Sequence, residues 1–137
     1  MIQAKKITKV YGDQHAVDQL SLDIPRGQFF GLLGPNGSGK TTSIHMLSTL
    51  IQPTGGSITI NGLDVQSHPQ QVRRDIGLVF QESALDRMLS IEENLYFCAG
   101  LHGINKLAIT TRMNALLDLF ELQSKKRAPV GSLSGGM

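Results

Sequence analysis

Residues 34–41 read Gly-Pro-Asn-Gly-Ser-Gly-Lys-Thr and match the pattern G-x-x-x-x-G-K-[ST] without a gap. Glycine lets a main chain pass close to phosphate oxygens with its N–H groups turned toward them. A helix that begins near Lys40 would add the positive end of its dipole. The stretch therefore predicts a phosphate-binding loop, with Lys40 on the β- and γ-phosphates and the Thr41 hydroxyl placed to bind Mg²⁺.

The sequence on either side of this loop has the order that such a site needs. Residues 29–33 are continuously apolar, which predicts a strand covered on both faces. After Lys40 the apolar period becomes helical, with Ile44, Leu47 and Ile51, together with Leu50, on one face and an end near Pro53. The alternative, a glycine-rich turn without a ligand, does not require this strand–loop–helix order.

Further strands are expected in the first 82 residues. Leu20, Leu22 and Ile24 alternate with polar residues, which predicts a half-buried strand. The alternation of Ile58 and Ile60 predicts another, and residues 76–80 read as a further buried strand. This part of the chain is therefore expected to be α/β.

The rest of the chain reads as helical. Ser90 and Glu93 form a predicted capping box, and the helix that they start should run to about Leu101, with Gly103 at its C-terminal end. A second helix is expected from about Leu107 to Phe120. Its apolar stripe would comprise Ile109, Met113, Leu116, Leu117 and Phe120. Residues 125–127 are all basic and are interpreted as a solvated linker.

Composition excludes several classes of protein. The chain has 137 residues, which is room for one domain, and with 40% apolar and 18% charged residues it is typical of a folded globular protein. A net charge of +2 is too small to predict nucleic acid or anionic lipid as the main partner. The single cysteine, Cys98, allows no intrachain disulfide and is interpreted as a small buried apolar residue. No apolar run approaches the ~20 residues of a membrane span.

Two more segments accompany the phosphate loop. The predicted strand at residues 76–80 leads to Gln81, and residues 133–137 read Leu-Ser-Gly-Gly-Met. With the loop, they closely resemble the ATP-binding subunit of ATP-binding-cassette (ABC) transporters, and the resemblance covers residues 2–137 in order. Residues 80–95 look most like the exporter branch that includes multidrug and daunorubicin-type efflux ATPases.

This resemblance implies a P-loop NTPase fold of the ABC type. Residues 1–82 would be the nucleotide-binding core, with an N-terminal β-rich part, and residues 83–137 a helical subdomain. It also implies an ATP site in which Tyr11 stacks on adenine. The phosphates would lie among Gly34, Asn36, Gly37, Ser38, Gly39, Lys40, Thr41 and Thr42. Gln81 would contact Mg²⁺ beside Thr41, orient the attacking water, and act with Lys40 in catalysis. The alternative for Tyr11 is a tyrosine at the surface end of a strand, and the alternative for Gln81 is a polar residue at a strand end.

The same resemblance implies partners. In the family, the signature (here Ser134, Gly135 and Gly136) reaches the γ-phosphate of ATP held by a second ATP-binding subunit, in a head-to-tail dimer. Its fifth residue is usually Gln and is Met137 here. The surface after Gln81 would dock membrane-spanning permease subunits, which implies a cytoplasmic protein peripheral to the inner face of the cell membrane.

Parts of the family's chemistry are not found before the signature. An acidic residue that ends a buried strand, a following glutamate and a later histidine all lie downstream of it in the family. Asp118 continues a helical pattern and is interpreted as a surface charge, and the four histidines have no metal-ligand spacing. We therefore expect a chain that lacks the C-terminal part of the fold, exposes apolar surface, binds ATP and hydrolyses it very slowly or not at all.

Two other functions stay open. One is a nucleotide-binding module without catalysis, or a truncated inactive product. The other is an ABC ATPase of translation or DNA repair, which ranks lower because no long insertion lies between Lys40 and Leu133.

Overall fold

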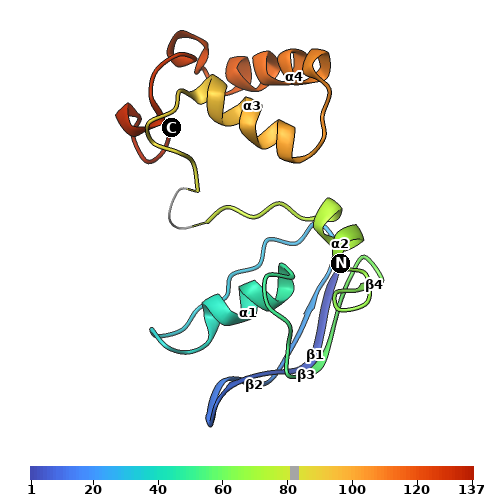
Figure 1. Cartoon of the computed structure of the whole chain (residues 1–137). Helices are drawn as coiled ribbons and strands as arrows, with labels where there is room; N and C mark the ends of the chain where they lie inside the picture. Colours follow the sequence, from blue (N-terminus) through green and yellow to red (C-terminus); the bar gives the residue numbers. More distant parts are fainter. Residues whose placement is uncertain (81–83) are drawn as a thin grey trace. The chain divides into compact units, whose positions relative to one another are not determined.

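The computed structural model describes residues 1–80 and 84–137, which divide into two compact units, Met1–Val79 and Phe80–Met137 (Figure 1). The boundary predicted after residue 82 lies outside the described residues. The first unit combines a sheet with two helices, and the second is helical, as the sequence predicts.

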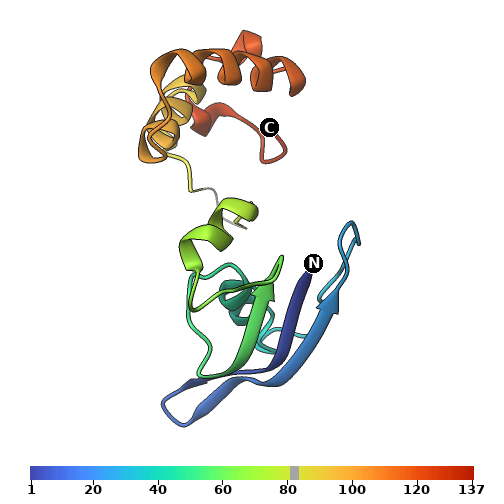
Figure 2. The same ribbon diagram turned by 90° about the vertical axis from the view of Figure 1, so that its right-hand side faces the viewer.

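The first unit is built on an antiparallel sheet of four strands in the order β2-β1-β3-β4. Figure 2 looks onto its strands. Ile2 pairs with Ile24 on one side and with Ile60 on the other, which places β1 at the centre of the unit. The predicted strand segments at residues 20–24 and 58–60 are confirmed within β2 and β3. The strands are β1 (Ile2–Tyr11), β2 (Gln14–Ile24), β3 (Gly55–Ile60) and β4 (Leu63–Asp64).

One face of this sheet is covered by α1 (Lys40–Leu47) and α2 (Pro69–Asp75). The alternating residues Ile58 and Ile60 point into the core because successive side chains of a strand face opposite ways. The helices add Met46, Leu47 and Val72, and the remaining core residues are Ala4, Ile7, Val17 and Val65. This packing fixes α1 against the sheet, and α1 is the helix that follows the glycine-rich loop.

The strands predicted at residues 29–33 and 76–80 are not formed. A buried strand needs neighbouring strands for its main-chain groups and layers on both faces, and among the described residues neither segment is paired. Phe29 is fully exposed, and Leu33 and Val79 are 92% and 95% exposed. The expectation of exposed apolar surface is thus confirmed at these segments.

The buried face of α1 differs from the prediction. Ser43, Met46 and Leu47 are buried, whereas Ile44 is 39% exposed. The helix also ends at Leu47, well before Pro53, because Thr49 takes a left-handed conformation with φ of 62°. Leu50 therefore lies outside the helix and is half exposed.

The second unit pairs α3 (Ile91–Leu101) with α4 (Lys106–Leu119), followed by two short 3-10 turns, η1 (Gln123–Lys125) and η2 (Val130–Ser132). Ile91, Met113 and Leu117 form its core. The predicted Gly103 end of α3 is confirmed, since Gly103 has a φ of 66°. Of the predicted α4 stripe, Leu116 and Phe120 are exposed instead, at 39% and 64%.

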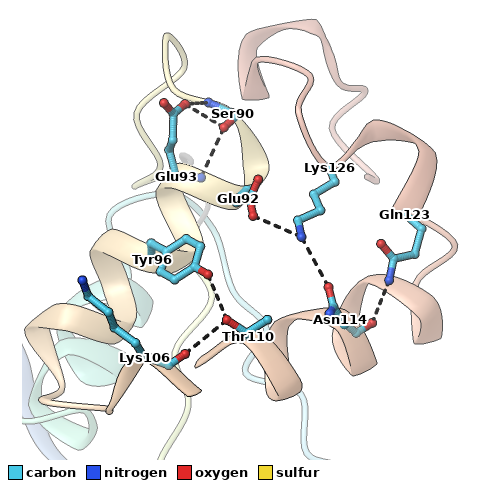
Figure 3. A network of polar contacts seen from close by, with 9 residues as sticks. All are labelled: Ser90, Glu92, Glu93, Tyr96, Lys106, Thr110, Asn114, Gln123 and Lys126. Atoms are coloured by element: carbon cyan, nitrogen blue, oxygen red, sulfur yellow. Dashed lines mark hydrogen bonds and ion pairs between the residues drawn. The ribbon is translucent and has the colours of Figure 1, made fainter. Parts of the chain in front are cut away.

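The predicted capping box of α3 is confirmed (Figure 3). The Ser90 hydroxyl oxygen accepts the Glu93 N–H at 3.2 Å, and Glu93 Oε2 accepts the Ser90 N–H at 2.8 Å. Hydrogen bonds from the Ser90 side chain, and then from its backbone, hold the pKa of Glu93 below its ordinary value. A carboxylate therefore locks the start of α3.

Cys98 is exposed, which corrects the prediction of a buried residue. It lies in an open groove between α3 and α4, beside Leu95, His102 and Ile109, and α4 does not cover it. Asp118 is exposed on α4, so its interpretation as a helix-surface charge is confirmed.

Asn94 is the polar residue at the centre of the second unit and is only 4% exposed. Its Oδ1 accepts the Asp86 N–H at 2.9 Å, and its amide N–H groups face the Asp86, Leu89 and Ser90 carbonyls at 2.9, 3.4 and 3.1 Å. One side chain thus satisfies the main chain of the segment that leads into α3.

We expect Asn94→Ala to lower the free energy of unfolding of this unit by about 2–3 kcal/mol, because several buried main-chain groups lose their partner. Urea denaturation followed by Tyr96 fluorescence in a Tyr11→Phe background would measure it, since the chain has two tyrosines and no tryptophan. Asn105→Ala is the matched control. It removes a single N-cap bond to Ala108 and should cost about 1 kcal/mol. An equal or smaller loss for Asn94→Ala would contradict this role.

Because the pKa of Glu93 is lowered in the folded chain, its contribution is present at neutral pH and is lost as pH falls through that lowered value. We expect Glu93→Gln to be less stable than the parent at neutral pH and to show a smaller loss of stability between neutral pH and about pH 3. Urea titrations across this range measure the difference. Glu121→Gln, at an exposed site without such bonds among the described residues, should leave the acid limb unchanged.

Candidate functional site

The glycine-rich loop enters α1 through left-handed main chain. Gly37 and Gly39 have φ of 82° and 83°, values that glycine adopts without the steric cost of a side chain. Gly39 is the N-cap of α1, and no side chain caps that end. In the part of the chain that the structure describes, the first N–H groups of α1 therefore have no side-chain acceptor, which is the condition under which a helix start can bind an anion.

Gly39 is also where the loop meets the sheet. A Cβ placed on it would lie 2.3 Å from the Ala16 carbonyl oxygen and 2.9 Å from Val17 Cγ2. Both residues belong to β2, so the absence of a side chain lets the start of α1 pack directly on that strand. The position of the loop is thereby set by main chain rather than by flexible side chains.

The Lys40 ammonium lies against its own loop. Lys40 Nζ donates to the Gly34 carbonyl at 2.7 Å and to the Pro35 carbonyl at 2.6 Å. The Ser38 N–H donates to the Pro35 carbonyl at 3.3 Å, which closes the turn. The loop thus already has a curved form, with a positive charge at its centre and the half-buried Lys40 stem at the helix start.

Thr41, Thr42 and Asn36, which are also predicted to bind the nucleotide held by this chain itself, lie in the same unit as the loop. Thr41 is exposed and Thr42 half-buried in the first turn of α1, and Asn36 is exposed in the loop. Among the described residues, the Thr41 hydroxyl has no hydrogen-bond partner that would compete with a ligand. Gln81 lies outside the described residues.

Tyr11 ends β1 and is 52% exposed. It pairs with Gln14 across the β1–β2 hairpin, two residues before Ala16, the residue against which Gly39 lies. The ring and the loop are therefore joined through one end of β2. Lys9 Nζ lies 5.2 Å from the centre of the ring, within range of a cation–π interaction.

The predicted signature lies in the second unit, after η2. Leu133 packs against the α3–α4 core, and the Met137 N–H donates to the Ser134 carbonyl at 3.0 Å. A pocket of about 620 Å³ adjoins these residues and is lined by Leu85, Arg87, Val130, Leu133, Ser134, Gly135 and Met137. Gly135 and Gly136 are exposed, with open space where a Cβ would be, so their main chain is accessible.

Sequence reasoning missed two residues that organise this second site. The sequence does contain an indication for Asn94, because it is a polar residue three positions after Ile91, on the helix face expected to be buried. Lys126 lay in the basic run interpreted as a solvated linker, but its Nζ lies 3.1 Å from Glu92 Oε1 and both side chains are largely covered. Spacing alone gives no signal for that pair.

Residues 1–80 and 84–137 contain no group of three or more His, Cys, Asp or Glu residues that could hold a metal ion. None of their helices has the length and apolar character needed to span a membrane.

We expect Gly39→Ala to destabilise the first unit more than Gly37→Ala. Both changes place a Cβ at positive φ, at about 1 kcal/mol each. Only the Cβ at position 39 would collide with β2, because nothing lies within 4 Å of the one at position 37. Urea denaturation of the two variants would measure the difference, and equal losses would contradict the packing role of Gly39.

Comparison with known proteins now identifies the family. The ABC transporter family matches residues 17–137. Over 137 residues the chain is 41% identical to Nod factor export ATP-binding protein I of Cupriavidus pinatubonensis, and over 133 residues it is 44% identical to the doxorubicin resistance ATP-binding protein DrrA of Mycobacterium tuberculosis. These alignments cover 100% and 96% of the chain, but only 42% and 40% of the two relatives.

Solved structures agree with this assignment. The dimeric post-hydrolysis state of the ATP-binding cassette MJ0796, bound to ADP and Pi, matches 99% of the chain at 29% identity with a TM-score of 0.81, and the chain covers 64% of it. An ATP-binding subunit of an ABC transporter matches equally widely, at 28% identity and a TM-score of 0.80, over 57% of its own length. The chain belongs to the ABC transporter family and corresponds to part of the α/β P-loop fold of its ATP-binding domains.

Proposed function

We propose that this chain is part of the ATP-binding subunit of an ABC exporter and that it binds Mg-ATP at the loop of residues 34–41. The observation that carries the proposal is the uncapped start of α1 beside the Lys40 ammonium. Main-chain N–H groups, a helix dipole and one cation meet there, and together they suit the β- and γ-phosphates of a nucleotide.

The residues that would bind the nucleotide held by this chain itself have distinct roles in this proposal. The loop from Gly34 to Gly39 surrounds the phosphates, and Lys40 leaves the Gly34 and Pro35 carbonyls to contact them. Thr42 lies in the same first turn of α1. The exposed ring of Tyr11 offers a flat surface on which adenine can stack.

The residues present also fit Mg²⁺. The Thr41 hydroxyl is an exposed oxygen ligand of the kind that Mg²⁺ prefers, and Gln81 would add an amide oxygen. When bound, Mg²⁺ would neutralise charge on the β- and γ-phosphates. Gln81 would also orient the attacking water, since an amide can hold water without taking up its proton.

We further propose that the signature acts on a second subunit. Ser134, Gly135 and Gly136 present a hydroxyl and accessible main chain, which suit the γ-phosphate of a nucleotide bound by another copy. The solved MJ0796 cassettes are described as dimeric, which supports dimerisation. In the proposed head-to-tail pair, two ATP molecules would lie between the subunits.

The names of the two relatives, which refer to Nod factor export and doxorubicin resistance, support export as the direction of transport. Export would proceed through separate membrane-spanning subunits docked on the surface that follows Gln81. The subunit would then be cytoplasmic and peripheral to the inner face of the membrane.

In the family, hydrolysis also uses an acidic residue that ends a buried strand and a following glutamate. Asp118, which follows the apolar residues 115–117, lies on the surface of α4 instead. We propose that a polypeptide of residues 1–137 binds Mg-ATP and turns it over very slowly or not at all.

Lys40→Met should weaken Mg-ATP binding by about tenfold to a hundredfold, because a charge-assisted contact to phosphate contributes about 1.5–3 kcal/mol. Titration with a fluorescent ATP analogue and Mg²⁺ would measure the dissociation constant, and phosphate release would measure turnover. Lys5→Met, at an exposed position of β1, is the matched control and should bind like the parent. A change below about threefold in Lys40→Met would contradict the site, and normal turnover that Lys40→Met abolishes would contradict the expected inactivity.

A further inference from the structure

The segment before the signature is paired along its main chain with the segment that starts α3. Four N–H groups take part, two from each segment. Glu92 N–H donates to the Lys126 carbonyl at 3.1 Å and Ile91 N–H to the Ala128 carbonyl at 3.2 Å. In return, Val130 N–H donates to the Leu89 carbonyl and Gly131 N–H to the Arg87 carbonyl, both at 2.9 Å. Residues 126–131 are thereby held along residues 87–92.

This pairing is tight where it approaches the signature. A Cβ on Gly131 would lie 3.0 Å from the Arg87 carbonyl oxygen, so the two main chains are close there. From Gly131 the chain passes through η2, where the Leu133 N–H donates to the Val130 carbonyl at 3.1 Å. Ser134 follows directly, so any shift of residues 126–131 moves the signature.

At the other end of this pairing, the Lys126 side chain contacts both α3 and α4 (Figure 3). Its Nζ lies 3.1 Å from Glu92 Oε1 on α3 and 3.4 Å from Asn114 Oδ1 on α4. The Lys126 and Glu92 side chains are 25% and 27% exposed, so water screens this pair less than it screens a surface ion pair. Lys126 thus ties the segment to both helices of the second unit.

The other links in Figure 3 make these helices a firm support. The Gln123 Nε2 donates to the Asn114 carbonyl at 3.3 Å, and the Tyr96 hydroxyl lies 3.0 Å from Thr110 Oγ1. The first bond joins η1 to α4, the second joins α3 to α4, and neither involves Lys126. Because the Tyr96–Thr110 contact and the apolar core remain, removal of the Lys126 charge should release the segment rather than separate α3 from α4.

The neighbouring basic residues differ from Lys126. Lys125 is exposed, with its Nζ 3.4 Å from Met137 Sδ, and Arg127 is exposed with no side-chain bond or ion pair recorded among the described residues. Within residues 1–80 and 84–137, Lys126 is the one of these three basic residues whose charge is balanced by a carboxylate. Its position therefore argues for support of the main chain and against direct binding of phosphate.

We infer that Lys126 is a positioning residue for the signature. Through Glu92 and Asn114 it fixes residues 126–131, and through them it sets the place of Ser134 and Gly135. This inference rests on the proposed function only for its consequence, the contact of the signature with a nucleotide held by a second subunit.

Amide hydrogen exchange tests the positioning without nucleotide. In Lys126→Met, which keeps the length of the side chain and removes its charge, exchange at the Val130, Gly131 and Leu133 amides should rise about tenfold, as for the loss of one charge-assisted bond. Lys126→Arg should restore most of the protection. Arg127→Met removes the adjacent charge and should leave these amides unchanged. Unchanged exchange in Lys126→Met, or an equal rise in Arg127→Met, would overturn the inference.

A second measurement uses the complete ATP-binding subunit that contains residues 1–137. It distinguishes failure of this inference from failure of the proposed function. Sedimentation would give the dissociation constant of the Mg-ATP-bound dimer, and a fluorescent ADP analogue would give affinity at the phosphate loop. Lys126→Met should weaken the dimer about tenfold with unchanged ADP affinity. If the parent binds no nucleotide, the proposed function fails while amide exchange still decides the positioning. If the parent dimerises and Lys126→Met dimerises equally well, the positioning role fails.

Discussion

The contact of Gly39 with β2 is the constraint on which the proposed nucleotide site depends. A helix start can hold an anion only if its N–H groups are free and its position is fixed. Here the helix is fixed by main-chain contact with the Ala16 carbonyl, and its end is left without a side-chain cap. Buried Met46 and Leu47 hold the rest of α1 on the sheet. The apolar core and the polar loop therefore meet at Gly39. Because it has no side chain, the helix can pack on β2 and its first N–H groups stay uncapped.

The parts of the structure that the sequence predicted are those fixed by local chemistry. The glycine-rich loop, the Ser90–Glu93 capping box and the alternation of Ile58 and Ile60 each follow from residues within a few positions of one another. The apolar run at residues 29–33 differs, because apolar character predicts burial but burial requires neighbours from elsewhere in the chain. The same reason explains Ile44 and Cys98, whose exposure depends on what packs against their helices. Family resemblance supplied the roles of Tyr11 and the signature, which spacing alone could not.

The polar contacts of the second unit were the hardest part to predict. Asn94 binds main-chain groups of the segment before α3, and Lys126 contacts Glu92 and Asn114, which precede it by more than ten residues. Such contacts produce no periodic pattern in the sequence, because each depends on where a loop brings distant residues together in the fold. They nonetheless decide how the main chain near the signature lies. A helical subdomain with a small apolar core thus depends on a few well-satisfied polar side chains for a defined form.

The position of Lys40 has a consequence for the thermodynamics of ligand binding. Its ammonium already holds the Gly34 and Pro35 carbonyls, so the loop is ordered by an internal cation before any phosphate arrives. A flexible glycine-rich segment would otherwise lose much conformational entropy when it closes around a ligand. Here that loss is incurred during folding, and the ligand exchanges one set of acceptors for another around the same lysine. Affinity should therefore reflect the difference between phosphate and carbonyl as acceptors more than the cost of ordering the chain.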